Sequence, residues 1–588
     1  TSFLLGYGIS YKLGMRAFEE LGRQAYRRIQ ENPYILTMIR GITFEDADRI
    51  AEDRGFPAKN KERYKSALWY CLFEKEQDGN TGAEVKFLCH MTADKLEKMR
   101  PDGGNDTRGV FESLLDLVKD GSLKCKTYYE GDQKVQFVFR KDMWETEEGI
   151  AEDFIDIALS PAPAAPELDK IYDEVTDKLP FTLDSVQEKA AKEAIRNSVL
   201  IMTGEPGTGK TTNIKVINEE YKKLYPKNGR VFLAPTGRAA RKMAEAVGED
   251  AHTIHSYLHI FEGMVMDDPV EIEDSLVVID EFSMVDVYTA RELFRSIKRG
   301  CKVVIIGDMD QLPSVGPGAV MRDLVSCITD KADIKVPFIR LEKIYRQRDD
   351  EKIYENVAKI NRGDTSISDG SDFMLHELSS MEDVKNEMAA KYVEDVKEYG
   401  LGNVMCLCPV KEHIAGVKDM NQTLQGILNP FKKGMKELKH KGEAFREGDL
   451  VMHLKNTEDA SNGDIGKVIE VNDDSMKALI NNTVIEYEHD DLDNVMLAYA
   501  TTVHKSQGSE ADAVVYCVSK RHVNMLYRNI PYVAVSRGKK RVDIFGQKTA
   551  LDEAILNVKK NMRVTLLGDF LKERCGMFIA VNMGSCPF

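Results

Sequence analysis

A glycine-rich loop between residues 204 and 212 carries the clearest chemistry in this sequence. The segment from Ser198 to Thr212 reads S-V-L-I-M-T-G-E-P-G-T-G-K-T-T, which contains the pattern G-x-x-x-x-G-K-[ST]. A loop of this kind, between an apolar strand and a helix, presents backbone N–H groups to phosphate. We expect Lys210 to reach the β- and γ-phosphates of a nucleoside triphosphate, and the Thr211 hydroxyl to hold Mg²⁺. The residues predicted to bind the triphosphate here are Gly204, Glu205, Pro206, Gly207, Thr208, Gly209, Lys210, Thr211 and Thr212.

An acidic pair and two glutamines have the types needed to complete an ATP-hydrolysing site. Asp280 and Glu281 follow the apolar run 276–279. Asp280 would complete the Mg²⁺ shell, and Glu281 would orient and deprotonate the attacking water. The alternative for this pair is a helix N-cap with a first-turn acid. Gln311 could contact the γ-phosphate and nucleic acid together, whereas Gln187 could read the edge of adenine or be a solvated helix residue.

Two arginines and a tyrosine in the second half of the chain suit the other side of such a site. Arg346 lies in L-E-K-I-Y-R-Q, and Arg537 lies in Y-V-A-V-S-R-G. An arginine finger from a second domain contributes about 10³–10⁵ in rate, and it acts only when the two domains are closed. Surface salt bridges are the alternative for both arginines. Tyr345 would stack on the base or serve as a core aromatic, and Gly508 lies in a segment suited to phosphate contact.

Strands and helices must bring these residues together. From about residue 181 apolar runs alternate with amphipathic helices, which is typical of an α/β domain with a parallel sheet. The runs ending at residues 202, 234, 279 and 306 are each followed by a polar motif, and ligands of such sheets bind at the carboxyl ends of strands. A second α/β series follows residue 338, with strands expected at 404–407, 495–499, 514–518 and 542–545.

The first part of the chain is predicted to be helical. Residues 1–66 hold two glycine-bearing turns, at 6–9 and 40–43, each before an amphipathic run; they resemble tandem helix–hairpin–helix units, which grip DNA phosphates. Thr43 stands where that family prefers glycine, so a helical bundle used only for packing is the alternative. Residues 84–150 predict helices and a two-stranded wing turning at Glu130-Gly131-Asp132. A proline-rich stretch follows and predicts a linker.

Composition excludes several classes of protein. The chain has 588 residues, 43% of them hydrophobic, and no uninterrupted apolar run long enough to span a membrane. The ten cysteines form no C-x-x-C pair, which argues against a zinc site or a disulfide framework and favours a reducing cytoplasm. The net charge of −16 argues only mildly against a nucleic-acid partner, because local basic clusters occur near Arg238 and Arg537.

Taken together and in this order, the motifs resemble the superfamily 1 helicases of the 5′→3′ branch, specifically its RecD-like members. The resemblance runs from Gln187 through the glycine-rich loop, A-P-T-G-R-A-A, T-I-H, D-E-F-S, G-D-M-D-Q-L-P-S-V-G-P-G, Y-R-Q, T-V-H-K-S-Q-G and V-A-V-S-R-G. It implies an ATP- and Mg²⁺-dependent DNA helicase in repair or recombination, acting as a monomer on single-stranded DNA and on single-strand/duplex junctions. Residues implied to line the single-strand groove are Pro235, Thr236, Arg238, Thr253, His255, Thr502 and His504.

The resemblance also implies the fold class and its boundaries. We expect α/β architecture with two RecA-like P-loop motor domains, an SH3-like β-barrel insertion, and an N-terminal all-α helix–hairpin–helix domain followed by a winged-helix-like region. The helix–hairpin–helix start is that of the long, free-standing type, and further residues are expected before Thr1. Predicted boundaries are 1–83 (helix–hairpin–helix), 84–158 (winged-helix-like), 159–170 (linker), 171–337 (first motor domain, with a short β-hairpin at about 258–268), 338–431 and 495–571 (second motor domain), 432–494 (barrel) and 572–588 (tail).

Three other functions stay open at this point. The short β-hairpin is compatible with a single-strand translocase or remodeller that hardly unwinds duplex. A scaffold with a degenerate ATPase is opposed by intact Lys210, Glu281 and Arg537. An RNA helicase is opposed by the lack of a visible RNA-binding module, although a motor that grips the backbone could accept either strand.

Overall fold

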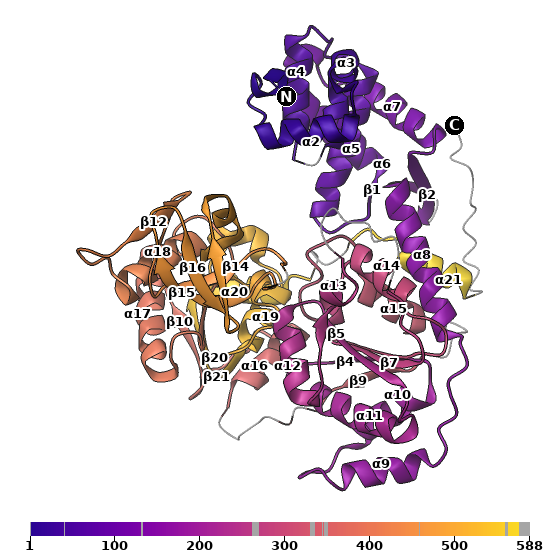
Figure 1. The fold of residues 1–588 in the computed structure, drawn as a ribbon, viewed down its shortest axis with the longest axis vertical. Helices are drawn as coiled ribbons and strands as arrows, with labels where there is room; N and C mark the ends of the chain where they lie inside the picture. The colour runs from indigo at the N-terminus through magenta and orange to yellow at the C-terminus, as the bar shows by residue number, and fades with distance from the viewer. Residues whose placement is uncertain are drawn as a thin grey trace.

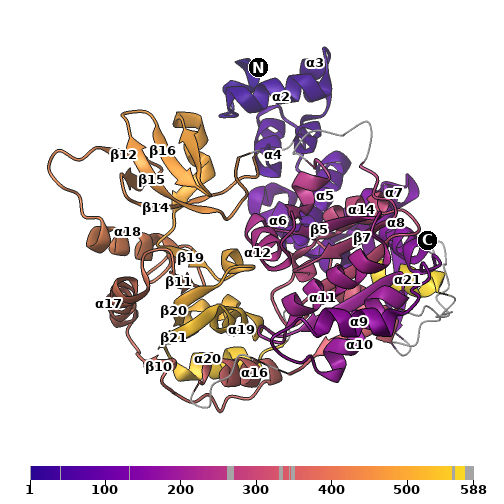
Figure 2. The same cartoon turned by 60° about the horizontal axis from the view of Figure 1, so that its bottom comes forward.

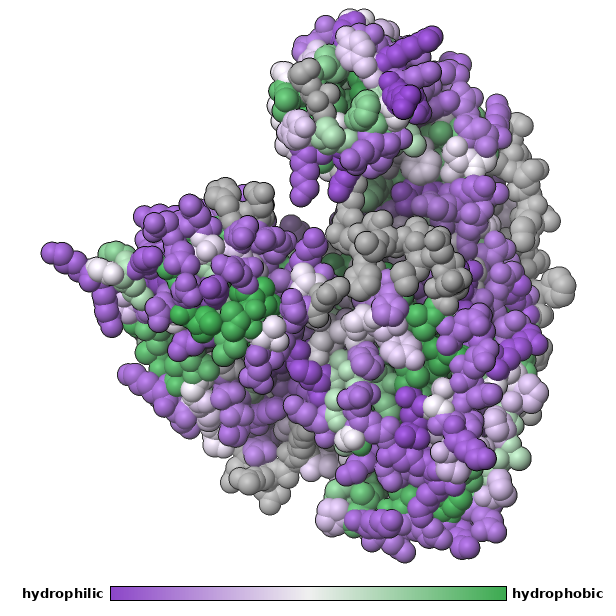
Figure 3. Space-filling model, viewed as in Figure 1, coloured by the Kyte–Doolittle hydropathy of each residue, from purple (hydrophilic) through white to green (hydrophobic). Residues whose placement is uncertain are grey.

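The fold has three lobes in the computed structural model, which describes residues 2–39, 41–130, 133–260, 270–329, 336–343, 345, 351–457, 459–558 and 563–575. The N-terminal lobe lies at the top of Figure 1, a first α/β domain lies below it, and a second α/β domain with a β-barrel lies beside that (Figure 1). The face in Figure 3 is mostly hydrophilic and is hollowed between the upper lobe and the barrel side. Within the described residues, no helix combines the length and apolar composition needed to cross a membrane.

The N-terminal lobe begins with short helices joined by tight turns, as predicted. The turn at 6–10 separates α1 from α2, and Gly41 to Thr43 precede α4. Thr43 starts α4 with a capping box, since its hydroxyl accepts the N–H of Asp46 at 3.1 Å and the Asp46 carboxylate accepts the N–H of Thr43. The helices are α1 (Ser2–Leu5), α2 (Tyr11–Leu21), α3 (Ala25–Glu31), η1 (Pro33–Met38), α4 (Phe44–Asp53) and α5 (Lys61–Gln77).

A buried ion pair ties α4 to α5 inside this lobe. Arg63 and Asp48 are only 1% and 2% exposed, and the guanidinium donates to both carboxylate oxygens at 2.7 Å. The hydroxyl of Tyr34 donates to the same carboxylate at 2.8 Å, and Arg63 also donates to the carbonyl oxygens of Ala58 and Leu96. The Asp48 carboxylate therefore accepts three hydrogen bonds, two of them from the charged guanidinium of Arg63.

The next region contains the predicted pair of wing strands. Strands β2 and β3 pair antiparallel along their whole length, and β1 pairs with β3 on the other side. The predicted turn residues Gly131 and Asp132 lie outside the described residues. The elements are β1 (Gly82–Glu84), α6 (Val85–Met99), η2 (Pro101–Gly103), α7 (Thr107–Lys119), β2 (Leu123–Glu130), β3 (Gln133–Arg140) and α8 (Lys141–Ala158).

The first α/β domain is built on a six-stranded parallel sheet in the order β6-β5-β7-β8-β4-β9. Both faces of the sheet are covered: Val199 and Ile201 pack against the core under α8, α14 and α15, while Leu200 and Met202 pack against α10, α11 and α12. This burial explains the uninterrupted apolar runs in the sequence. The strands are β4 (Val199–Gly204), β5 (Gly229–Ala234), β6 (His252–Thr253), β7 (Ser275–Ile279), β8 (Lys302–Gly307) and β9 (Phe338–Leu341). The helices are α9 (Leu168–Thr176), α10 (Ser185–Arg196), α11 (Lys210–Leu224), α12 (Gly237–Val247), α13 (Ile254–Tyr257), η3 (Phe282–Met284), α14 (Val287–Ser296) and α15 (Val320–Thr329).

The second α/β domain has a five-stranded parallel sheet in the order β10-β21-β20-β11-β19. Its strands are β10 (Phe373–Glu377), β11 (Val404–Cys408), β19 (Ala500–Thr502), β20 (Ala511–Val518) and β21 (Gly538–Gly546). Its helices are α16 (Ile353–Arg362), α17 (Met381–Tyr399), α18 (Val417–Leu428), η5 (His504–Ser506), η6 (Lys520–Met525), α19 (Asn529–Ser536) and α20 (Lys548–Leu556).

The predicted β-barrel region is an antiparallel array inserted between α18 and β19, and it stands above the second sheet in Figure 2. Its elements are β12 (Glu437–His440), β13 (Glu443–Arg446), β14 (Leu450–His453), β15 (Ile465–Val471), β16 (Met476–Ile480), β17 (Thr483–Tyr487), η4 (His489–Asn494) and β18 (Val495–Leu497). One expectation is wrong here. The apolar run 495–499 is not a strand of the second α/β sheet, because β18 pairs with β14 of the insertion and the sheet resumes only at β19.

The end of the chain also differs from the prediction that 495–571 belong to the second α/β domain and 572–588 form a tail. Helix α21 (Leu567–Arg574) packs against α8 and α15, and its residues Leu567, Phe570 and Leu571 belong to the core of the first α/β domain. Figure 1 shows this yellow helix beside α8. The tail beyond Cys575 lies outside the described residues.

The buried ion pair generates a stability prediction. Asp48→Ala leaves the Arg63 guanidinium buried without its carboxylate, which costs about 3–5 kcal/mol. We expect the free energy of opening measured by native-state hydrogen exchange in α4 and α5 to fall by about that amount. Glu31→Ala, which removes an exposed partner of Arg27, is the control and should leave it unchanged. Equal behaviour of the two variants would contradict the assigned role.

Candidate nucleotide site between the two α/β domains

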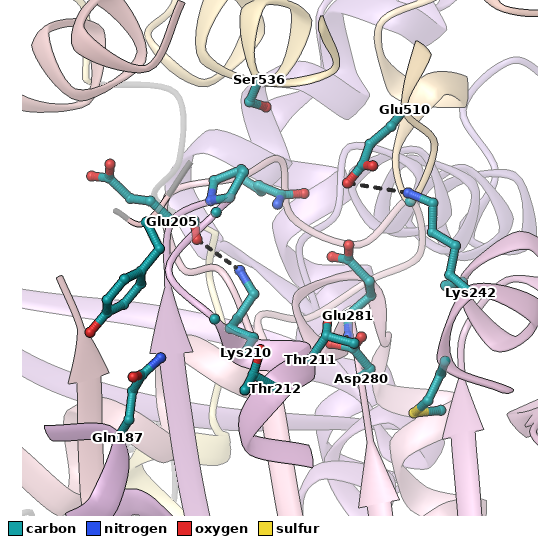
Figure 4. Close-up of a pocket in the computed structure, with 18 of the residues that line it drawn as sticks. Gln187, Glu205, Lys210, Thr211, Thr212, Lys242, Asp280, Glu281, Glu510 and Ser536 are labelled. Carbon is teal, nitrogen blue, oxygen red and sulfur yellow. Dashed lines mark hydrogen bonds and ion pairs between the residues drawn. The ribbon is translucent and has the colours of Figure 1, made fainter. Parts of the chain in front are cut away.

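A cavity of about 510 Å³ lies where the carboxyl ends of both sheets meet. Figure 4 shows side chains of the first α/β domain on one side of it and Glu510 and Ser536 of the second on the other. Of the residues predicted to bind or hydrolyse ATP, those that line the cavity are Gln187, Glu205, Pro206, Gly207, Gly209, Lys210, Thr211, Thr212, Asp280, Glu281, Gln311, Tyr345, Gly508 and Arg537. Gly204 and Thr208 lie just behind the wall, in the same loop.

The glycine-rich loop turns sharply before α11. Gly207 and Gly209 have φ of 86° and 89°, a conformation that favours glycine. A Cβ on Gly209 would also lie 2.3 Å from the amide nitrogen of Gln187. The ammonium of Lys210 donates to the carbonyl oxygens of Gly204 and Glu205, so the positive charge is held inside the loop, where phosphate oxygens would bind.

Gln187 is buried rather than a solvated helix residue, since it is only 3% exposed. Its amide is already engaged: the oxygen accepts the N–H of Asp184 at 3.1 Å, and the nitrogen donates to the carbonyl of Thr208 at 3.3 Å. The first bond completes the capping box of α10. Gln187 therefore fixes the loop against α10, and its contact with adenine stays a prediction.

The acidic pair lies beside Lys210 and Thr211 at the end of β7 (Figure 4). Burial and the neighbouring Glu281 raise the pKa of Asp280 to about 6, while the charge of Lys210 opposes this shift. Glu281 adopts a left-handed backbone with φ of 51°, an arrangement that non-glycine residues keep mainly at functional sites. A threonine hydroxyl and a buried carboxylate are oxygen ligands of the kind that Mg²⁺ takes together with phosphate oxygens, so Thr211 and Asp280 fit this ion.

Arg537 crosses from the second α/β domain to the first. Its guanidinium donates to the amide oxygen of Gln311 at 2.8 Å and to the carbonyl of Ser509 at 3.2 Å. Arg537 and Gln311 are 3% and 4% exposed, so the alternative of a surface salt bridge is wrong for this arginine. Within the described residues, the Nε–H of Arg537 has no hydrogen-bond partner. A buried, unpaired donor on the cavity wall is suited to an anionic ligand.

Further polar contacts join the two domains around this bond. Tyr532 donates its hydroxyl to Asp308 at 2.7 Å, and Asn529 donates to the carbonyl oxygen of Asp310 at 2.7 Å. Gln507 donates to the carbonyl of Leu312 at 2.8 Å. All three reach the loop that follows β8, so this loop is the main contact of the second domain on the first.

The structure describes Tyr345 but not its neighbour Arg346, so only the prediction for Tyr345 can be compared with it. Tyr345 is 42% exposed on the cavity wall, which excludes the core-aromatic alternative, and its N–H donates to the carbonyl of Gly207 at 3.1 Å. Its hydroxyl donates to Asp184 at 2.5 Å. Arg346 and most of the hairpin at 258–268 lie outside the described residues, so their predicted roles stay predictions.

Sequence reasoning missed several residues of the cavity, and three of them have aromatic or charged side chains. Phe181 lines it with 52% of its surface exposed, and Lys242 and Glu510 form an ion pair of 3.3 Å across the two domains. The dashed line in Figure 4 marks this pair. The sequence offered a signal for two of them, because Lys242 lies two residues after A-P-T-G-R-A-A and Glu510 lies two residues after T-V-H-K-S-Q-G.

The predicted single-strand residues occupy strand ends in both domains. Thr236 caps α12 and Thr253 caps α13, whereas Thr502 accepts the N–H of Lys505 at 3.2 Å. A Cβ on Gly508 would lie 3.1 Å from the Thr236 hydroxyl, so the two domains meet at this point. The residues placed along these ends are Pro235, Thr236, Arg238, Thr253, His255, Thr502 and His504, all half-buried.

Two of these residues have specific surroundings. Arg238 donates to the carbonyl of Glu510 at 2.9 Å, so its guanidinium holds the domain interface. Burial lowers the pKa of His255, and burial together with the charge of Arg563 lowers the pKa of His504. Both imidazoles are therefore favoured in the neutral form, which can donate one hydrogen bond and accept another.

Comparison with known proteins shows which helicases this chain resembles. Residues 1–82 match the ATP-dependent RecD2 DNA helicase HHH domain, and residues 420–482 match the ATP-dependent RecD-like DNA helicase SH3 domain. Residues 182–380 match the AAA domain, and residues 497–544 match the UvrD-like helicase C-terminal domain. The chain is 27% identical over 579 residues to the ATP-dependent RecD2 DNA helicase of Deinococcus radiodurans, covering 96% of this chain and 76% of that protein. The chain thus has the domain set of RecD-like DNA helicases.

Other similar proteins and structures share less sequence with this chain. This RecD-like chain is 26% identical over 465 residues to the RecBCD enzyme subunit RecD of Mycobacterium tuberculosis, covering 70% of this chain and 76% of the subunit. A Pif1 helicase from Bacteroides in complex with ADP-AlF3 and single-stranded DNA is 21% identical with a TM-score of 0.38, covering 62% of this chain and 92% of that one.

The contact between Arg537 and Gln311 predicts a specific kinetic defect. Arg537→Ala should lower the kcat of ATP hydrolysis by about 10³ or more, with little change in the KM for ATP, because the guanidinium is predicted to act on the transferring phosphoryl group. Steady-state ATPase kinetics measure both constants. Lys540 lies three residues after Arg537 and forms an exposed ion pair with Asp512. Lys540→Ala removes only this pair, so it is the matched control and should retain activity. Equal loss of kcat and nucleotide affinity in Arg537→Ala would count against a finger role.

Proposed function

We propose that this RecD-like protein is an ATP-driven 5′→3′ DNA helicase that moves along single-stranded DNA and opens single-strand/duplex junctions during repair or recombination. The observation that carries the proposal is the cavity shared by the two α/β domains, with Arg537 of one bonded to Gln311 of the other. A site divided in this way makes hydrolysis depend on domain geometry. The names of the relatives, which include an ATP-dependent DNA helicase, support the same reaction.

The proposed cycle begins with nucleotide binding in the loop. Backbone N–H groups of the loop and the Lys210 ammonium would hold the phosphates, and Tyr345 and Phe181 offer exposed aromatic surfaces for the base. Thr211 and Asp280 would hold Mg²⁺, which neutralises developing charge on the phosphate oxygens. Glu281 would orient the attacking water and take its proton.

Closure of the two domains would complete the site. Arg537 would turn part of its hydrogen bonding from Gln311 to the transferring phosphoryl group, for which its free Nε–H is available among the described residues. The change in this hydrogen bond at Gln311 would be transmitted to the loop that follows Gln311. After hydrolysis, groups of the two domains would no longer bind the same phosphate anion. The polar contacts between the domains could then break.

Domain movement would be converted into movement of the strand by residues at the strand ends. Thr236, Thr253 and Thr502 are short polar groups near backbone N–H groups, which suits phosphate contacts without base reading. His255 and His504 would contribute hydrogen bonds in their neutral form. We propose that alternating binding of the strand by the two domains moves it by about one nucleotide per cycle. We also propose that the protein acts as a monomer and is located in the cytoplasm.

The decisive experiment compares unwinding of duplexes that carry a 5′ or a 3′ single-stranded tail. We expect ATP-dependent strand separation only with the 5′ tail, together with ATPase stimulation by single strands. Lys210→Ala is the control, because it should bind single strands without hydrolysing ATP or unwinding either substrate. Unwinding from the 3′ tail would contradict the polarity. Stimulated ATPase without unwinding would favour the single-strand translocase, and no stimulation in active-site-intact protein would favour the scaffold.

A further inference from the structure

The last described segment, residues 563–575, follows the second α/β domain in sequence but packs elsewhere. Its helix α21 packs against α8 and α15, and Figures 1 and 2 both show it beside α8. The segment therefore crosses from the second α/β domain to the first and reaches the N-terminal lobe. No role in the ATP site described above explains these contacts.

Arg563 grips the loop that follows Gln311. Its guanidinium donates to the Ser314 hydroxyl at 2.9 Å, and to the carbonyl oxygens of Gly316 at 2.9 Å, Gly318 at 2.7 Å and Ser314 at 2.5 Å. In the described part of the chain, no carboxylate is within ion-pairing distance of Arg563. The planar, multi-donor shape of arginine, rather than its charge alone, suits these four carbonyl and hydroxyl acceptors.

The N-terminal lobe closes the same junction from the other side. The carbonyl of Gly79 accepts the N–H of Gly318 at 2.9 Å, and the Thr81 N–H donates to the carbonyl of Val564 at 2.8 Å. Asn80 accepts the N–H of Val564 at 3.0 Å. A Cβ on Gly79 would lie 2.3 Å from the Arg563 guanidinium, so glycine is required for this close approach.

Helix α21 is held at both ends by residues that precede the first α/β sheet. The buried carboxyl group of Glu147 on α8 accepts the N–H of Leu566 at 3.2 Å and that of Leu567 at 3.3 Å, so it satisfies N–H groups that have no partner within the helix at its N-terminus. Toward its other end, Glu573 accepts a bond of 2.6 Å from Lys126 on β2. The segment thus bridges the wing strands, α8 and α15.

We propose that residues 563–575 form a staple that joins the N-terminal lobe and the first α/β domain into one body, with Arg563 as the positioning residue for loop 314–318. Nucleotide-driven opening then moves the second α/β domain against both. Gln311 lies three residues before Ser314, so the staple also sets the loop that meets Arg537. Only the kinetic part of this inference rests on the proposed helicase function.

The structural test uses hydrogen exchange at the amides of Gly318 and Thr81, whose acceptors lie across the junction. Arg563→Ala should speed exchange at both by about tenfold, because the junction opens locally. Gly79→Ala should do the same by pushing the guanidinium away while leaving every motor residue intact. Gly55→Ala is its matched control, since Gly55 has a similar φ of 76° and no atom near a Cβ.

Each hydrogen-exchange result either supports or contradicts the proposed staple. Arg563→Lys keeps the charge but cannot bridge the four acceptors, so we expect it to exchange like Arg563→Ala; wild-type exchange in this variant would overturn the positioning role. Unchanged exchange in both Arg563→Ala and Gly79→Ala would overturn the staple, and so would equal acceleration in Gly55→Ala.

The kinetic arm measures single-strand-stimulated ATP hydrolysis of the same variants. Arg563→Ala and Gly79→Ala should lower kcat about fivefold with the KM for ATP unchanged, because loop 314–318 is displaced while the nucleotide loop is intact. Faster exchange with wild-type kcat would overturn the positioning role. Absence of stimulation in the wild-type protein would instead contradict the proposed function, and the exchange experiment would still decide the staple.

Discussion

The hydrogen bond between Arg537 and Gln311 is the constraint on which the rest of the structure depends. Both side chains are buried, yet they belong to different α/β domains, so neither is fully satisfied unless the domains are in contact. The two parallel sheets make this bond possible, because their carboxyl ends lie at the same cavity. In the proposed mechanism, the glycine-rich loop, the acidic pair and Arg537 act together only when the two domains are in contact.

The contacts around that bond are polar and individually weak. Tyr532, Asn529, Gln507 and Arg238 each make hydrogen bonds across the interface, and a typical bond of this kind contributes about 0.5–1.5 kcal/mol. Water can replace such partners when the domains separate, whereas a large apolar interface would resist opening. The first α/β domain, by contrast, shares a continuous apolar core with α8 and α21, so it should behave as a rigid unit.

Local sequence signals predicted much of the site and failed where long-range packing decides. The glycine-rich loop, Asp280 and Gln311 follow buried parallel strands, which have a strong local pattern. The run at 495–499 was misassigned because only two residues separate β18 from β19, and the pairing of each strand, which the sequence does not show, decides its sheet. The sequence of helix α21 contains no pattern that predicts which domain the helix packs against. The Asp184-x-x-Gln187 capping box was readable, however, and would have predicted the structural role of Gln187.

The central claim is that nucleotide state and domain geometry are one variable. The most direct measurement is the distance between labels at two exposed positions, Lys215 on α11 and Asn386 on α17, by single-molecule energy transfer. We predict a short distance with a non-hydrolysable ATP analogue, a longer one with ADP, and loss of this difference in Arg537→Ala. One distance that is independent of nucleotide and of Arg537 would contradict the account.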